Sequence, residues 1–136
     1  MLEKHPIIFV DDDEDDRQIF QEGFSQAGCN GKFIQFGSGN QLLEFLQTNS
    51  SDEFPLLILL DLNMPGTDGR EVLRQLKTTP EWIHIPVVVF TTSTHERDRK
   101  MAYELGANCF VSKPAGYQEV LDVTRSIAEL WCNAVK

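Results

Sequence analysis

Five consecutive aliphatic residues, Leu56 to Leu60, leave few folds open to this chain. The run has no polar face, so it predicts a strand that is buried on both sides, as in a parallel sheet covered by helices. It is too short to cross a membrane. Asp61 follows it directly, and Pro65 and Gly66 then turn the chain. The sequence therefore predicts a carboxylate at the carboxyl end of a central strand, where open α/β sheets build their sites.

Four more apolar runs alternate with segments of helical periodicity along the rest of the chain. The expected strands are residues 7–10, 32–36, 56–60, 86–91 and 109–112, and the expected helices are residues 14–27, 38–48, 69–78, 96–105 and 117–131. Strict alternation of strand and helix predicts an α/β fold with a parallel sheet. Five such units fit a flavodoxin-like, doubly wound sheet with five helices and strand order 2-1-3-4-5.

Polar residues follow four of the expected strands. Asp11 and Asp12 come after the first strand and Asp61 after the third, and these two strands are neighbours in the predicted order. Thr91 ends the fourth strand, and Lys113 follows the fifth. Because parallel strands end at the same edge of a sheet, we expect all five side chains to converge there.

The bulk composition limits the function classes. The net charge of −9, from 21 acidic and 12 basic residues, argues against a nucleic-acid surface, which needs clustered Lys and Arg. The acids at 13–16 open a helix, where they favour the macrodipole, and we interpret them as structural. Cys29, Cys109 and Cys132 have no metal-ligand spacing, and no signal peptide is visible. We expect reduced thiols, a cytoplasmic protein and one domain, residues 1–136, without an output domain.

Three carboxylates at one sheet edge repel one another unless a cation lies between them. Oxygen ligands without His or Cys indicate Mg²⁺, held here between Asp12 and Asp61. A phosphate donor could then meet the Asp61 oxygen, while Lys113 and Thr91 stabilise the charge of the phosphoryl group in transfer. The product would be an aspartyl phosphate.

The motifs, in their order and spacing, resemble the CheY-like receiver domain of two-component response regulators over almost the whole chain. The motifs that carry the resemblance are Val10-Asp11-Asp12, Asp61-Leu62-Asn63-Met64-Pro65, Asp68-Gly69, the run from Pro86 to Thr91, Gly106-Ala107 and Lys113-Pro114.

The resemblance implies that Asp61 is the phosphoacceptor, which receives a phosphoryl group from a sensor histidine kinase. It further implies that Asp12 binds Mg²⁺ directly, Asp11 acts mainly through water, and Asn63 offers its backbone carbonyl to the metal. Lys113 would bind the phosphoryl group through its ammonium, and its bond to the following proline is expected to be cis.

Thr91 and Phe110 would form the switch pair of such a domain. The hydroxyl would move to the phosphate while the aromatic ring turns inward, and a downstream protein or a phosphotransfer protein would read the change. The chain would be a phosphoacceptor with slow self-dephosphorylation, not an enzyme. Details such as Gly106 to Cys109 resemble stand-alone regulators that serve bacterial phytochromes, and Trp131 is a candidate dimer contact.

Three alternatives stay open on the sequence. A pseudo-receiver adaptor would never take phosphate, and the intact set of Asp12, Asp61, Thr91 and Lys113 counts against it. An aspartyl-phosphate hydrolase of the haloacid dehalogenase type usually has an acid two residues after the nucleophile, where this chain has Asn63. Flavin binding would need a phosphate-cradling loop after the first strand, where six acids stand instead.

Overall fold

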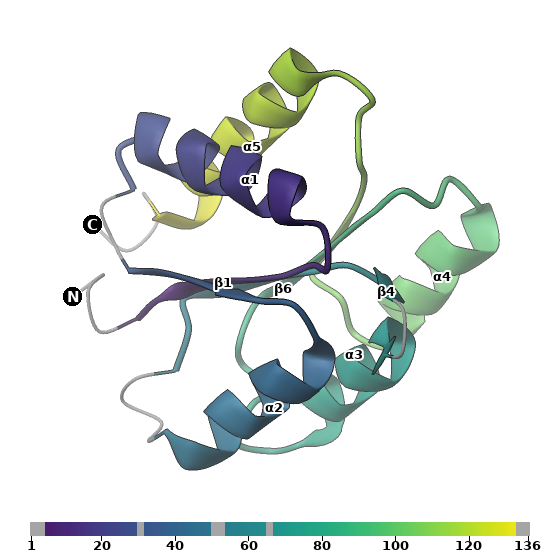
Figure 1. Ribbon diagram of the computed structural model, residues 1–136. Helices are drawn as coiled ribbons and strands as arrows, with labels where there is room; N and C mark the ends of the chain where they lie inside the picture. The colour runs from purple at the N-terminus through teal and green to yellow at the C-terminus, as the bar shows by residue number, and fades with distance from the viewer. Residues whose placement is uncertain (1–4, 30–31, 50–53, 65–66, 133–136) are drawn as a thin grey trace.

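The computed structural model describes residues 5–29, 32–49, 54–64 and 67–132 and has a central parallel sheet between layers of helices (Figure 1). Each predicted strand and helix is present, with bounds within one residue of those expected. The strands are β1 (Ile7–Val10), β2 (Phe33–Phe36), β3 (Leu57–Leu60), β6 (Val87–Thr91) and β7 (Cys109–Ser112). The helices are α1 (Glu14–Gln26), α2 (Gly39–Thr48), α3 (Gly69–Thr78), α4 (Glu96–Glu104) and α5 (Tyr117–Cys132).

The strand order is β2-β1-β3-β6-β7, which confirms the predicted order 2-1-3-4-5. In the register, Val10 of β1 lies beside Leu60 of β3, and Leu60 lies beside Val89 of β6. Thr91 at the end of β6 lies beside Ser112 at the end of β7. The carboxyl ends of these four strands therefore stand in one row.

A short hairpin after β3 was not predicted from the sequence. Its two antiparallel strands are β4 (Asn63–Met64) and β5 (Thr67–Asp68), and the predicted turn residues Pro65 and Gly66 lie outside the described residues. Strands of two residues carry no periodicity, so the sequence could only indicate a turn there.

Alternate residues of the strands feed two separate cores, one on each face of the sheet. Figure 1 shows α1 and α5 together on one face and α2 and α3 on the other. On the α1–α5 side the buried strand residues are Ile7, Phe9, Leu57, Leu59, Val88 and Phe90. On the opposite side they are Ile8, Val10, Ile58, Leu60, Met64, Val87, Val89 and Phe110. Burial on both faces explains why these strands read as continuous apolar runs.

The expectation of three reduced thiols is wrong for Cys29. This residue is disulfide-bonded, whereas Cys109 is a free thiol. Disulfide formation depends on two Cα atoms lying within about 7 Å of each other, which sequence spacing does not reveal. Within the described part of the chain, no helix has the length and apolar character needed to cross a membrane.

Candidate functional site

The row of strand ends brings the five predicted site residues together. The sheet's hydrogen bonding continues past the strands, because the backbone N–H of Asp61 donates to Val10 O (3.0 Å) and that of Lys113 donates to Thr91 O (2.7 Å). These bonds fix the backbone of Asp61 beside the end of β1 and that of Lys113 beside Thr91. Asp61 and Thr91 are both buried.

Asp11, Asp12 and Asp61 form a group of oxygen ligands. One carboxylate oxygen from each lies within 4.8 Å of the others. Asp11 and Asp61 are buried, whereas Asp12 is exposed, so the group opens to solvent on the Asp12 side. Hard oxygen donors at this spacing fit a divalent cation such as Mg²⁺ or Mn²⁺.

Lys113 is the cation of the site, and its side chain is only 7% exposed. Its Nζ atom donates to Asp11 Oδ2 (2.6 Å), Asp16 Oδ2 (3.0 Å) and Asp61 Oδ2 (3.1 Å). Burial lowers the pKa of Lys113, but the bond to Asp11 and the charges of Asp11 and Asp61 outweigh this and raise it above its ordinary value. Lys113 is therefore charged at neutral pH, and its three N–H donors each have a carboxylate partner.

Burial disfavours the ionised form of Asp11. Burial raises its pKa from 3.8 to about 6, against the lowering effects of Lys113 and of the Asp13 backbone N–H, which donates to Asp11 Oδ1 (2.9 Å). Lys113 cannot fully compensate Asp11, because the same ammonium also serves Asp16 and Asp61. Without a bound cation, this carboxylate is poorly stabilised in its ionised form.

Asn63 joins Asp61 to Thr91. Its backbone N–H donates to Asp61 Oδ1 (3.0 Å), and its side-chain Nδ2 donates to Thr91 Oγ1 (2.9 Å). The backbone N–H of Ser93 also donates to Thr91 Oγ1 (3.3 Å). The expected metal-binding group of Asn63, its backbone carbonyl, stays a prediction, but the side-chain contact with Thr91 was not anticipated.

Phe110 is buried in the core on the α2–α3 side of the sheet, with only 7% of its surface exposed. Its backbone N–H, on the edge strand β7, donates to the hydroxyl of Tyr103 on α4 (3.1 Å). The ring therefore already occupies an inward position in this structure. The predicted movement of the pair Thr91 and Phe110 concerns a second state and stays a prediction.

Gly69, the first residue of α3, lets this helix begin directly against the backbone that follows β3. A Cβ atom at this position would lie 2.6 Å from Leu62 Cα and 2.8 Å from the carbonyl oxygen of Asp61. Separations this short are not tolerated between a side chain and backbone atoms. The glycine after Asp68, part of the motif seen in the sequence, is thus required for the packing of α3 against the Asp61 segment.

Two features of the site differ from the sequence-based predictions. The structure has no cis peptide bond among the described residues. The bond between Lys113 and Pro114 is therefore trans, and the prediction of a cis bond is wrong. Trans is the ordinary preference even before proline, by about 0.5–1 kcal/mol. Asp16, interpreted as a structural helix acid, instead contacts Lys113. These residues meet because Lys113 reaches Asp11 at the end of β1, and the first turn of α1, with Asp16, begins just after it.

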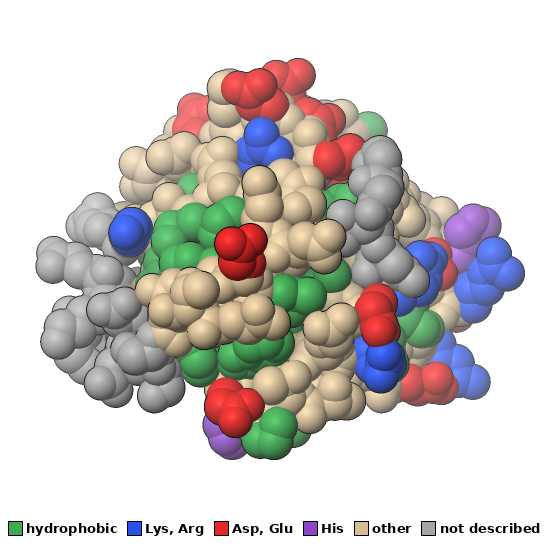
Figure 2. Space-filling view, turned by 60° about the horizontal axis from the view of Figure 1, so that its bottom comes forward, with side chains coloured by type: hydrophobic (Ala, Val, Ile, Leu, Met, Phe, Trp, Pro, Cys, Tyr) green, Lys and Arg blue, Asp and Glu red, His purple; other side chains and the backbone are tan. Residues whose placement is uncertain are grey.

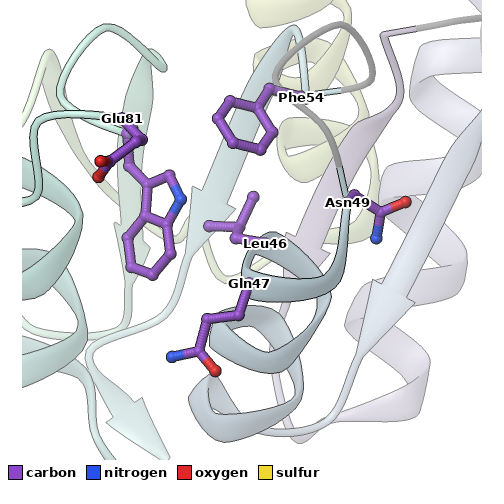
Figure 3. Close-up of a pocket in the computed structure, with 6 residues that line it drawn as sticks. Leu46, Gln47, Asn49, Phe54 and Glu81 are labelled. Atoms are coloured by element: carbon purple, nitrogen blue, oxygen red, sulfur yellow. The ribbon is translucent and has the colours of Figure 1, made fainter.

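A hollow with a volume of about 390 Å³ lies away from this site, at the amino ends of the strands. Its lining comes from the end of α2 and from the loops before β3 and β6: Leu46, Gln47, Asn49, Phe54, Glu81 and Trp82. Figure 3 shows Leu46 and Phe54 beside this space. Glu81 is the one ionisable residue of the lining, so the hollow has no set of groups for phosphoryl or metal chemistry.

Figure 2 shows one face of the molecule with its side chains coloured by type. The Lys and Arg side chains on this face are few or mixed with Asp and Glu, and they form no broad basic patch. Apolar side chains reach the surface near the centre of the same view.

The fold and this arrangement of acids, hydroxyl and lysine define a receiver domain. Residues 7–125 match the response regulator receiver domain family, and the chain belongs to it. Among curated relatives, it is 36% identical over 132 residues to response regulator Rcp1 of Synechocystis sp., covering 95% of this chain and 90% of that protein.

Solved structures agree with this assignment. The Mn²⁺-bound form of response regulator Rcp1 has a TM-score of 0.88 and 36% identity, covering 97% of both chains. The phosphorylated cyanobacterial phytochrome response regulator RcpA also has a TM-score of 0.88, with 32% identity over 96% of this chain and 95% of that one. The family assignment and the fold therefore rest on sequence and structure together.

Proposed function

We propose that this receiver domain accepts a phosphoryl group on Asp61 from a histidine kinase and passes the signal to a partner protein. The observation that carries the proposal is the convergence of Lys113 on Asp11 and Asp61 at the carboxyl ends of the strands. A buried ammonium beside a carboxylate nucleophile suits phosphoryl transfer, in which the negative charge on the phosphoryl oxygens must be balanced.

In the transfer step, an Asp61 carboxylate oxygen forms the new bond to phosphorus, and the bond from phosphorus to the imidazole nitrogen of the kinase breaks. The leaving nitrogen keeps the electron pair of that bond. Lys113 then turns from the Asp61 oxygen to a phosphoryl oxygen, and the Thr91 hydroxyl donates a hydrogen bond to another phosphoryl oxygen. Each of these groups lies at the same sheet edge, so the reacting atoms need no rearrangement of the strands.

Mg²⁺ is the proposed cofactor. Asp11, Asp12 and Asp61, with the backbone carbonyl of Asn63, would hold it, and the carboxylate group described above fits a divalent cation. The bound ion would neutralise charge on the phosphoryl oxygens. The related Rcp1 is known in a Mn²⁺-bound form, which supports an oxygen-ligated cation site of this kind.

The switch is proposed to run through Thr91 and Phe110. To reach a phosphoryl oxygen, the Thr91 hydroxyl must give up the bond that it receives from the Asn63 side chain (2.9 Å). Because Thr91 is hydrogen-bonded to the loop residue Ser93, its movement would also shift the start of α4. Phe110, packed on the same side, would hold the new position.

The chain is proposed to act as a phosphoacceptor with slow self-dephosphorylation and not as a hydrolase. The residue two positions after Asp61 is Asn63, whose side chain donates to Thr91 and offers no acid or base for rapid hydrolysis. A pseudo-receiver role is disfavoured because Lys113 contacts Asp61 directly.

The partners are proposed from the relatives. Similarity to Rcp1 and to the phytochrome response regulator RcpA favours a phytochrome-type histidine kinase as donor. Rcp1 aligns over 90% of its own length, which supports a single receiver domain over residues 1–136. A downstream or phosphotransfer protein would receive the signal, and Trp131 is a candidate homodimer contact. We place the protein in the cytoplasm, beside its kinase. Disulfides such as the one at Cys29 are uncommon in that compartment.

Intact mass after incubation with acetyl phosphate tests the proposed function. The wild type should gain one phosphoryl group when Mg²⁺ is present and none when EDTA is added, and Asp61→Asn should gain none. Asp12→Asn should need a higher Mg²⁺ concentration, because it removes one ligand. A wild type that takes no phosphate although it binds Mg²⁺ would contradict the assignment and favour the adaptor role.

A further inference from the structure

Lys113 has one carboxylate partner that lies outside the predicted metal ligands. Asp16, on the first turn of α1, accepts from Lys113 Nζ at 3.0 Å, and its side chain is 27% exposed. The other two partners, Asp11 and Asp61, follow strands and belong to the carboxylate group that could hold a cation. Asp16 is therefore the partner that neither the cation nor the phosphoryl group would engage.

The position of Asp16 is fixed by the start of its helix. The Asp13 side chain caps α1 by accepting from the backbone N–H groups of Asp15 (2.9 Å) and Asp16 (3.4 Å). Arg17, the next residue, donates from Nη1 to the carbonyl oxygen of Asp11 (2.5 Å). The first turn of α1 is thus tied to the end of β1, and the Asp16 carboxylate is held over the site from the helix side.

Phosphorylation changes the partners of Lys113 unequally. An Asp61 oxygen would become part of the acyl phosphate, and Asp11 would belong to the group that holds the cation, so both bonds of Lys113 to these residues would be altered. The bond to Asp16 has no such reason to change. An unbranched lysine side chain with several rotatable bonds would otherwise lose a fixed direction at the moment when its ammonium must meet the phosphoryl group.

We propose that Asp16 is a positioning residue for Lys113: it holds the ammonium in place while Asp61 is phosphorylated. The inference rests on the proposed function of Asp61 and adds a residue to it. Asp16 touches neither the phosphoryl group nor the metal, and its effect passes entirely through Lys113.

Asp15 provides a matched control. It is the neighbouring acid on the same helical turn and is exposed, and its side chain has no hydrogen-bond or ion-pair partner among the described residues. Asp15→Asn and Asp16→Asn remove the same charge from the same end of α1. Only the second also removes a contact with Lys113.

The test measures phosphorylation by acetyl phosphate over a series of Mg²⁺ concentrations. Asp16→Asn should lower the maximal rate at saturating Mg²⁺ by about tenfold, the effect of about 1.4 kcal/mol on a barrier. Asp15→Asn should stay within about twofold of the wild type, because exposed charges contribute little. Asp16→Glu should recover part of the rate. A general loss of negative charge would instead change the half-saturating Mg²⁺ concentration in both Asn variants and leave the maximal rates equal.

Unfolding in urea with EDTA gives a second measurement that needs neither metal nor phosphate. The destabilisation caused by Asp16→Asn should be lost when Lys113→Met is already present, because the two residues share one interaction. Additive changes, or a maximal rate of Asp16→Asn equal to or above that of Asp15→Asn, would overturn the positioning role and leave the proposed function intact. Failure of the wild type to take phosphate would overturn both.

Discussion

Replacing Asp11 by Asn should make the metal-free protein more stable at neutral pH, although it removes a bond from Lys113. Asp11 is fully buried, and its pKa rises from 3.8 to about 6 mainly because burial disfavours the charged form. A difference of one in pKa corresponds to about 1.4 kcal/mol, so ionised Asp11 costs the folded state about 3 kcal/mol. Asparagine resembles the neutral form but places an amide near Lys113, so we expect a gain of about 1–3 kcal/mol.

The sign of the pH dependence follows from the same pKa. Between about pH 4 and pH 6 the folded protein keeps a proton on Asp11 that the unfolded chain has already released. The contribution of this group to stability therefore falls as the pH rises through that window. The advantage of Asp11→Asn should be near zero below pH 4 and complete above pH 6.

Urea unfolding in EDTA, at several pH values from 4 to 7.5, measures both effects. Asp15→Asn serves as the control, because it removes an exposed acid from the adjacent helix and should change stability little at any pH. Added Mg²⁺ should stabilise the wild type more than Asp11→Asn and so reverse the order. An Asp11→Asn protein that is less stable than the wild type at pH 7, or a difference that does not depend on pH, would refute the reasoning.

Three other outcomes are expected. Gly69→Ala should destabilise the protein by about 1–3 kcal/mol and slow phosphorylation, because its Cβ would meet the backbone of the Asp61 segment within 3.0 Å. Gly37→Ala is the control, because its Cβ would have no neighbour closer than 3.7 Å. Thermal unfolding and intact-mass assays should show little change in its stability or its phosphorylation. Thr91→Val should still take up phosphate but lose the chemical-shift changes in α4 that NMR would detect on phosphorylation of the wild type; unchanged shifts of α4 in the phosphorylated wild type would contradict the switch. Iodoacetamide without reductant, applied to the unfolded chain, should modify Cys109 and leave Cys29 unmodified, as judged by peptide mass.

The fold was accessible from the sequence because burial on both faces of the sheet leaves a simple pattern. Runs such as Leu56 to Leu60 have no polar face, and each is followed by a segment of helical periodicity, so both the number and the order of the strands in the central sheet could be predicted. The hairpin at Asn63–Met64 was missed because two residues cannot show a period.

The site was accessible only where its residues follow strands. Asp61 and Lys113 could be placed together because the topology brings strand ends to one edge. Asp16 lies on a helix, 97 positions before Lys113 in the chain, and no local pattern distinguishes it from the other acids of α1. The contact of the Asn63 side chain with Thr91 depends likewise on a rotamer, which the sequence does not specify.

The saturation of the Lys113 ammonium has a consequence for the reversibility of signalling. Every N–H donor of this group already has a carboxylate partner before any phosphate arrives. Taking up a phosphoryl group is therefore an exchange of one acceptor for another, not the creation of a bond where none existed. Such an exchange leaves the number of acceptors around the ammonium unchanged. A receiver built in this way returns to its starting state once the acyl phosphate is hydrolysed, and its lysine has partners in both the phosphorylated and the unphosphorylated state.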